Sequence, residues 1–241
     1  GNALRLLKSG LLNSIKDLHP PFSLTDPNTI FQLSQKLDWF EDIFTTNYDI
    51  FLYHIVLSTL DRSRKKNNGI KRYQDFFIKK DSLLQFTAEP IPGYKNIFYV
   101  HGALFIHKEG QHILKIEREG RCEELLDLIR LKIHIGNLPV FVSEGKSEMK
   151  AETISKSKYL SFCKSAFRVK RNPMVIYGFS FSDCDEHLTE DLNEHKRKLA
   201  VGLYLPGLND AAIQRKVKGI EKKLYKYRAC EIKYFDSRTL F

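Results

Sequence analysis

The chain has 241 residues, 42% of them hydrophobic and 12% aromatic, and a formal net charge of +10. This composition supports a packed core and excludes an intrinsically disordered chain, and the length suits one large α/β domain or two small ones. No apolar run is long enough to span a membrane, and the N-terminus lacks a signal-peptide pattern. The four cysteines are scattered without a CxxC pair. They indicate reduced thiols in a cytoplasmic protein, rather than a zinc knuckle or a disulfide framework.

Positive charge gathers in four segments, at 62–72, 164–171, 195–198 and 215–228. Such clusters are typical of solvated helix faces and loops. They are also typical of surfaces that attract nucleotide phosphates or nucleic acid. Charge alone leaves both interpretations open.

In the first half of the chain, apolar spacing predicts a helix over 3–18. Asp26 followed by Pro27 predicts the start of a second helix that runs to about residue 42, because the carboxylate can cap it and proline needs no donor there. A strand over 43–48 and a helix over 49–60 follow. Residues 62–96 are basic and contain Gly and Pro, and we expect an insertion or small subdomain there.

In the second half of the chain, expected strands and helices alternate more regularly. We expect strands at 96–107 and 112–118, paired as a hairpin, then a helix at 123–135, a strand at 139–145 and one long helix at 148–169. Strands at 173–183, 199–206 and 230–237 should then alternate with helices at 186–198 and 209–227. Unbroken apolar strands between amphipathic helices predict a Rossmann-like, doubly wound α/β domain over 1–241, with a mostly parallel sheet and helices on both faces.

Four of these strands carry small and polar residues toward their carboxyl ends. They are Thr45, Thr46, Asn47 and Asp49 for the first strand, His101 and Gly102 for the second, Glu144 for the third, and Gly178, Ser180 and Asp183 for the fourth. Each has a plain structural explanation as a helix cap, a turn residue or a hydrogen-bonded core histidine. Their recurrence at carboxyl ends of strands, where open α/β sheets bind ligands, indicates a binding edge.

The segments IFTTNYD, YVHGAL, PVFVSEGKSEMK, ISKSKYL and VIYGFSFSDCDEH resemble, in this order and spacing, the sirtuin-like NAD-binding fold. The likeness is to its bacterial branch outside the protein deacylases, and within it to a family known only as a domain of unknown function. It covers the chain from about residue 3 onward. It implies that NAD is bound as substrate or ligand and consumed in bacterial anti-phage defence, with a fused or associated effector.

The resemblance also implies roles for single residues. Asn47 matches an asparagine that positions water over the nicotinamide ribose, and Asp49 an acidic residue near the nicotinamide. His101 matches the histidine that acts as base. Gly178 and Ser180 match a strand-end turn that accommodates ribose and phosphates. Thr45, Thr46, Gly102, Glu144 and Asp183 complete the expected cofactor-binding set.

The chain departs from this pattern at two places. No G-x-G occurs before Thr45 and the first residue is Gly1. Either a Gly-rich phosphate-binding segment is missing upstream, or the protein binds no dinucleotide in the usual way. The four-cysteine zinc module of the deacylases is absent, and no histidine pair has metal-ligand spacing, so no metal is expected.

These expectations favour an NAD glycohydrolase that breaks the nicotinamide–ribose bond. One alternative is a nucleotide-sensing module without turnover. The other is a nucleic-acid-associated protein that uses the basic helix at 210–228, where Tyr225 and Tyr227 could stack on bases. The sequence leaves the oligomeric state open, a homo-oligomer included.

Overall fold

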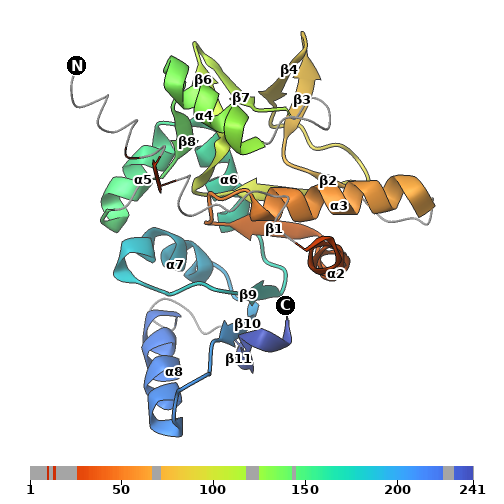
Figure 1. Ribbon diagram of the computed structural model, residues 1–241. Coiled ribbons are helices and arrows are strands. Elements are labelled where there is room, and N and C mark those ends of the chain that lie inside the picture. The colour runs from red at the N-terminus through yellow and green to blue at the C-terminus, as the bar shows by residue number, and fades with distance from the viewer. Residues whose placement is uncertain are drawn as a thin grey trace. The chain divides into compact units, whose positions relative to one another are not determined.

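The computed structural model describes residues 26–66, 72–117, 125–142, 145–224 and 231–240, together with Gly10, Asn13 and Ser14. The chain divides into two compact units, 1–141 and 142–241, and each is described by itself (Figure 1). The helix expected over 3–18 lies almost entirely outside the described residues.

Unit 1 contains a three-stranded parallel sheet, in the order β1-β5-β2. Its strands are β1 (Asp42–Thr45), β5 (Lys95–Tyr99) and β2 (Tyr73–Gln74). Helices α2 (Pro27–Leu37) and α3 (Phe51–Lys66) pack against each other beside it. The predicted start of α2 is confirmed, because the Asp26 carboxylate accepts the N–H groups of Asn28 and Thr29 at 3.1 and 3.0 Å.

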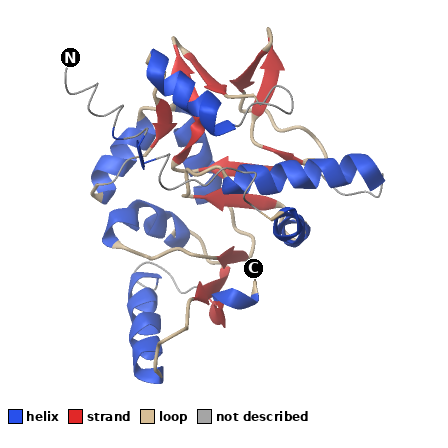
Figure 2. Cartoon of the chain, in the orientation of Figure 1, coloured by secondary structure: helices blue, strands red, loops and turns tan. Residues whose placement is uncertain are grey.

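A five-stranded antiparallel sheet completes unit 1, in the order β3-β4-β7-β6-β8. Its strands are β3 (Phe77–Lys80), β4 (Leu83–Phe86), β7 (His112–Lys115), β6 (Gly102–Glu109) and β8 (Pro139–Phe141). Helix α4 (Leu125–Ile135) lies against β6 (Figure 2). The hairpin of β6 and β7 is confirmed.

Two strand predictions in unit 1 are wrong. The strand expected over 96–107 breaks at Val100 and His101 into β5 and β6, which belong to different sheets. The strand expected over 139–145 is short and pairs antiparallel with β6, so it does not extend the parallel sheet. The described part of 62–96 contributes β2 to one sheet and β3 and β4 to the other.

The core of unit 1 centres on β5 and β6. Tyr99 and Phe105 are fully buried, with ring centroids 5.2 Å apart in an edge-to-face contact, and Tyr53 of α3 packs on Phe105 at 4.9 Å. Both faces of β5 are covered along most of its length, which explains the continuous apolar run in the sequence.

Unit 2 is a parallel βα arrangement with strand order β11-β10-β9. Its elements are α5 (Ser147–Ser155), α6 (Lys158–Val169), β9 (Met174–Ile176), η2 (Asp183–Asp185), α7 (Glu186–Asn193), β10 (Lys198–Leu203), α8 (Asp210–Leu224), β11 (Glu231–Asp236) and η3 (Ser237–Thr239). The single helix expected over 148–169 is wrong, because the chain breaks at Lys156 and Ser157. The Ser157 hydroxyl then caps α6 by accepting the Leu160 N–H at 3.4 Å.

The α/β class is therefore confirmed, and the described strands form two parallel sheets and one antiparallel sheet. Among the described helices, none has the length and apolar character needed to cross a membrane.

Candidate functional site

The carboxyl ends of β1 and β5 lie side by side in unit 1. Thr45 pairs with Tyr99 in parallel register, and the Val100 N–H donates to the Thr45 carbonyl at 2.9 Å. Beyond the strands, the Leu104 N–H donates to the Tyr48 carbonyl at 3.0 Å. The loop after β1 and the turn after β5, about 50 residues apart along the chain, are thus held at one edge of the sheet.

The loop after β1 presents its amide side chain to the surface. Asn47 is exposed, whereas Thr45 and Thr46 are half-buried. The Thr45 hydroxyl accepts the Asn47 N–H at 3.1 Å, which shapes the loop. A loop ordered this way leaves the Asn47 side chain able to hold water or a ligand hydroxyl.

Asp49 caps the start of α3, a structural role that its position in the sequence also allowed. One carboxylate oxygen accepts the N–H of Phe51, the first residue of α3, at 2.9 Å. This satisfies a donor at the helix start and places negative charge at the positive end of the helix dipole.

The turn after β5 carries His101 and Gly102. His101 is only 5% exposed, so its imidazole is largely withdrawn from bulk water. Gly102 has a φ of +80°, and a Cβ there would lie 2.0 Å from the Val140 carbonyl oxygen. Glycine is therefore required at residue 102 for the close pairing of β6 with β8, whether or not a ligand binds nearby.

In unit 2, the predicted residues after β9 lie in one turn with two left-handed residues. Gly178 has a φ of +68° and the buried Phe181 a φ of +55°, a conformation that costs a non-glycine residue about 1–2 kcal/mol. Ser180 is exposed, and its hydroxyl accepts the Ser182 N–H at 3.3 Å.

Lys223 of α8 holds this strained turn in place. Its ammonium donates to the Phe181 carbonyl at 2.6 Å and to the Asp183 carboxylate at 2.5 Å. The hydrogen bond and charge of Lys223 lower the pKa of Asp183. Asp183, expected to bind a cofactor, is thus engaged in an ion pair that fixes the turn.

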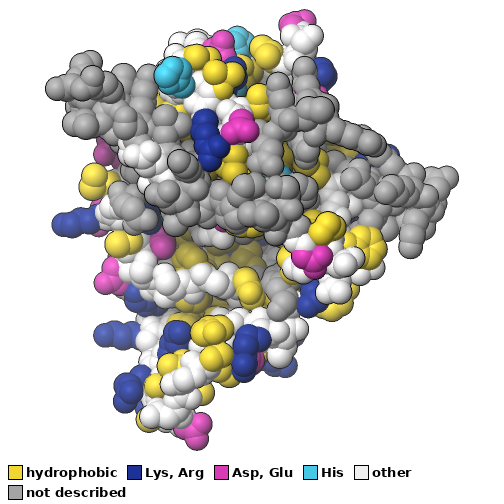
Figure 3. All heavy atoms as spheres, in the orientation of Figure 1, with side chains coloured by type: hydrophobic (Ala, Val, Ile, Leu, Met, Phe, Trp, Pro, Cys, Tyr) yellow, Lys and Arg dark blue, Asp and Glu magenta, His cyan; other side chains and the backbone are white. Residues whose placement is uncertain are grey.

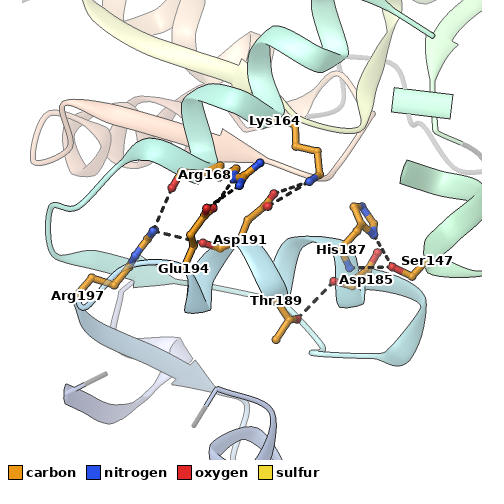
Figure 4. Close-up of polar contacts among 9 residues, drawn as sticks. All are labelled: Ser147, Lys164, Arg168, Asp185, His187, Thr189, Asp191, Glu194 and Arg197. Carbon is orange, nitrogen blue, oxygen red and sulfur yellow. Dashed lines mark hydrogen bonds and ion pairs between the residues drawn. The ribbon is translucent and has the colours of Figure 1, made fainter. Parts of the chain in front are cut away.

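Four residues without a predicted role tie α5 to the segment after β9. Figure 4 shows three of them, Ser147, Asp185 and His187. The Ser147 hydroxyl accepts the His187 N–H at 2.7 Å and lies 3.0 Å from His187 Nδ1. Lys150 and Asp185 form a largely buried ion pair at 2.8 Å. All four occur in GKSEMK and FSDCDEH, segments that carried the resemblance without a role for these residues.

A second polar cluster joins the C-terminal ends of α6 and α7 (Figure 4). Lys164 pairs with Asp191 at 2.8 Å, and Arg168 pairs with Glu194 through two nitrogens. The buried Arg197 donates to the main-chain carbonyls of Arg168 and Asp191, both at 3.4 Å. Cations at two helix C-termini satisfy terminal carbonyls and offset the negative ends of the helix dipoles.

Burial raises the pKa of Asp191, although Lys164 acts in the opposite direction, and the hydrogen bond from Arg168 lowers the pKa of Glu194. Beside these groups lies a cavity of about 420 Å³ lined by Ser165, Arg168, Val169, Arg171, Glu194 and His195. Because the ion pairs within the cluster and the contacts of Arg197 with two helix ends account for these charges, we assign the cluster a structural role.

The structure therefore brings the predicted site residues of each unit together. Thr45, Thr46, Asn47, Asp49, His101 and Gly102 gather at one sheet edge of unit 1, and Gly178, Ser180 and Asp183 share one turn of unit 2. Glu144 lies outside the described residues.

No curated protein matches the chain. A family model does match it, over residues 2–240 and thus over almost its whole length. The chain belongs to that family, which is described as Domain of unknown function (DUF4917).

Proposed function

We propose that this protein binds NAD and cleaves its nicotinamide–ribose bond. The observation that supports this most strongly is the pairing of β1 with β5, which holds the Asn47 loop and the His101 turn at the carboxyl edge of one parallel sheet. Open α/β sheets bind nucleotides at such an edge, and the resemblance to sirtuin-like domains assigns roles in NAD cleavage to these same two residues.

The reaction needs few groups from the protein. Nicotinamide departs as a neutral molecule, so no general acid is required, and the ribose becomes cationic in the transition state. In our proposal Asn47 holds the attacking water and His101 accepts its proton, a contribution of about 10²–10⁴-fold in rate. Asp49 caps α3 with one oxygen, and its charge opposes the cation on the ribose.

The Gly178–Ser182 turn of unit 2 is a separate candidate, because the resemblance implies that this turn accommodates ribose and phosphate. A turn with a left-handed Phe181 and a Lys223 clamp is preorganised, since it pays its ordering cost before any ligand arrives. Exposed Ser180 supplies a hydroxyl at the surface of the turn.

One observation favours a second function, nucleotide binding without turnover. Two carboxylates of the expected site are engaged elsewhere, Asp49 with the Phe51 N–H and Asp183 with Lys223. Carboxylates committed in this way stabilise a cationic ribose less strongly, and the protein would then serve as a sensor.

Nicotinamide release from NAD tests the catalytic proposal. The purified chain is compared with Asn47→Ala and His101→Ala, and with the matched controls Asn172→Ala and His134→Ala at exposed positions of the same residue types. We expect the two site variants to lose about 10²-fold or more in rate and the controls to keep it. Equal turnover in all five proteins would refute the assignment, and ADP-ribose binding in a calorimeter without any nicotinamide release would establish the sensor.

A second experiment tests the turn. Lys223→Met removes the clamp on Phe181, whereas Lys158→Met changes an exposed lysine of α6 and serves as the control. We expect weaker ADP-ribose binding only for Lys223→Met. Identical affinities for both variants would refute a role of the turn in nucleotide binding.

A further inference from the structure

Positive charge is distributed unevenly along the chain. Unit 2 (142–241) holds 20 of the 39 basic residues but only 13 of the 29 acidic ones. It therefore carries a formal charge of +7 out of the total of +10 on fewer than half of the residues. The site proposed for NAD does not account for this excess.

Helix α8 concentrates part of this charge on one face. Its apolar residues recur at helical spacing, at Ile213, Val217, Ile220 and Leu224, and the last two are buried. At 100° per residue, the opposite side of the helix carries Arg215, Lys218 and Lys222, all exposed. Exposed Lys216 lies to one side of this row. Figure 3 shows several Lys and Arg side chains over the α8 region, among hydrophobic and other atoms.

Within the described parts of the chain, no acidic partner neutralises this outward face. Among the described residues, Arg215, Lys216, Lys218 and Lys222 form no ion pair, whereas Lys223 on the flank is bound to Asp183. Arg215 with Lys218, and Lys218 with Lys222, are like-charge neighbours three and four residues apart, each costing about 0.2–0.5 kcal/mol. A bound anion would relieve this repulsion.

The remaining outward positions are small. Ala211 lies one turn before Arg215, and Gly219 lies between Arg215 and Lys222, where an added Cβ would meet nothing within 4 Å. The face thus offers charge without the large apolar or aromatic groups that anchor protein interfaces. The apolar stripe that membrane insertion requires is the inward side of the same helix.

We propose that the outward face of α8, formed by Arg215, Lys218 and Lys222, binds the phosphate backbone of a nucleic-acid duplex. Backbone binding needs an open row of cations and no sequence readout, which is what this face presents. Arg215 to Lys222 spans about 10 Å of helix, enough to reach three or four phosphates. Tyr225 and Tyr227, which could stack on single strands, lie outside the described residues.

The proposal sets the salt dependence of binding. Three phosphate contacts correspond to a slope of about −2.7 in a plot of log affinity against log salt, or a fall of about 40-fold between 50 and 200 mM. Because the contribution of phosphate contacts is electrostatic, the affinity for the duplex should not depend on base sequence.

Fluorescence anisotropy with a labelled DNA duplex of about 20 base pairs, titrated at several salt concentrations, measures this slope. The test variant is the full chain with Arg215→Gln, Lys218→Gln and Lys222→Gln. The control removes the same number of charges from exposed lysines elsewhere, by Lys80→Gln, Lys108→Gln and Lys158→Gln.

We expect the α8 variant to lose close to three units of slope and the control to keep most of its slope. Equal losses in both would show that only net charge matters and would overturn the proposal. Absence of duplex binding by the unaltered chain would also overturn it. So would binding to vesicles of phosphatidylcholine and phosphatidylserine in preference to the duplex.

Discussion

Replacing Gly102 by Ala should cost far more stability than the loss of one glycine usually does. The left-handed backbone, with a φ of +80°, costs an alanine about 1–2 kcal/mol. In addition, the new methyl group would lie 2.0 Å from the Val140 carbonyl oxygen and 2.7 Å from the Phe141 Cα. Both are backbone atoms of β8, so relief requires moving a paired strand, and overpacking of this kind costs about 1–3 kcal/mol more.

Gly93 provides the matched control for this experiment. It has the same φ of +80°, but a Cβ there would meet nothing within 4 Å. Gly93→Ala should therefore lose only the backbone term, about 1–2 kcal/mol, and Gly102→Ala a total of about 2–5 kcal/mol. Urea unfolding followed by circular dichroism gives both free energies of unfolding. Equal losses in the two variants would refute the steric argument for residue 102.

Three further predictions concern the interior of unit 1. Asp75→Asn leaves the buried Lys115 ammonium without its carboxylate, and we expect a loss of about 3–5 kcal/mol in urea unfolding; an unchanged midpoint would contradict a buried pair. Tyr73→Phe removes a hydroxyl shared by two main-chain carbonyls and should cost about 1–3 kcal/mol, whereas no loss would mean that water replaces it. Burial and the charge of Lys132 lower the pKa of His107 below 6.5, so the unfolded chain binds its proton more readily and stability should fall as the pH drops through 6.5. His107→Gln should reduce this loss of stability at low pH. If the variant and the unaltered chain have the same pH profile of stability, other groups cause the loss.

The local sequence determined where many of the elements begin. Asp26 before Pro27 marks the start of α2, and the Asn209 side chain caps α8 by accepting the Ala212 N–H at 2.9 Å. These signals act between residues a few positions apart, so they can be read without the fold. The adjacency of the Asn47 loop and the His101 turn was predictable for a related reason, since the carboxyl ends of parallel strands meet at one edge of a sheet.

Other features depended on residues far apart in the chain, and only the tertiary structure decided them. The break at His101 follows from β6 joining a different sheet, and the need for glycine at residue 102 follows from β8 lying against it. The contacts of Ser147 with His187 and of Lys223 with Asp183 each join residues 40 positions apart. Such pairs leave no periodic signal, because they are selected by packing between elements rather than by propensity within one. The sequence by itself thus determined the α/β elements and the residues at the strand ends, and tertiary packing decided which of those residues hold the structure and which remain available to a ligand.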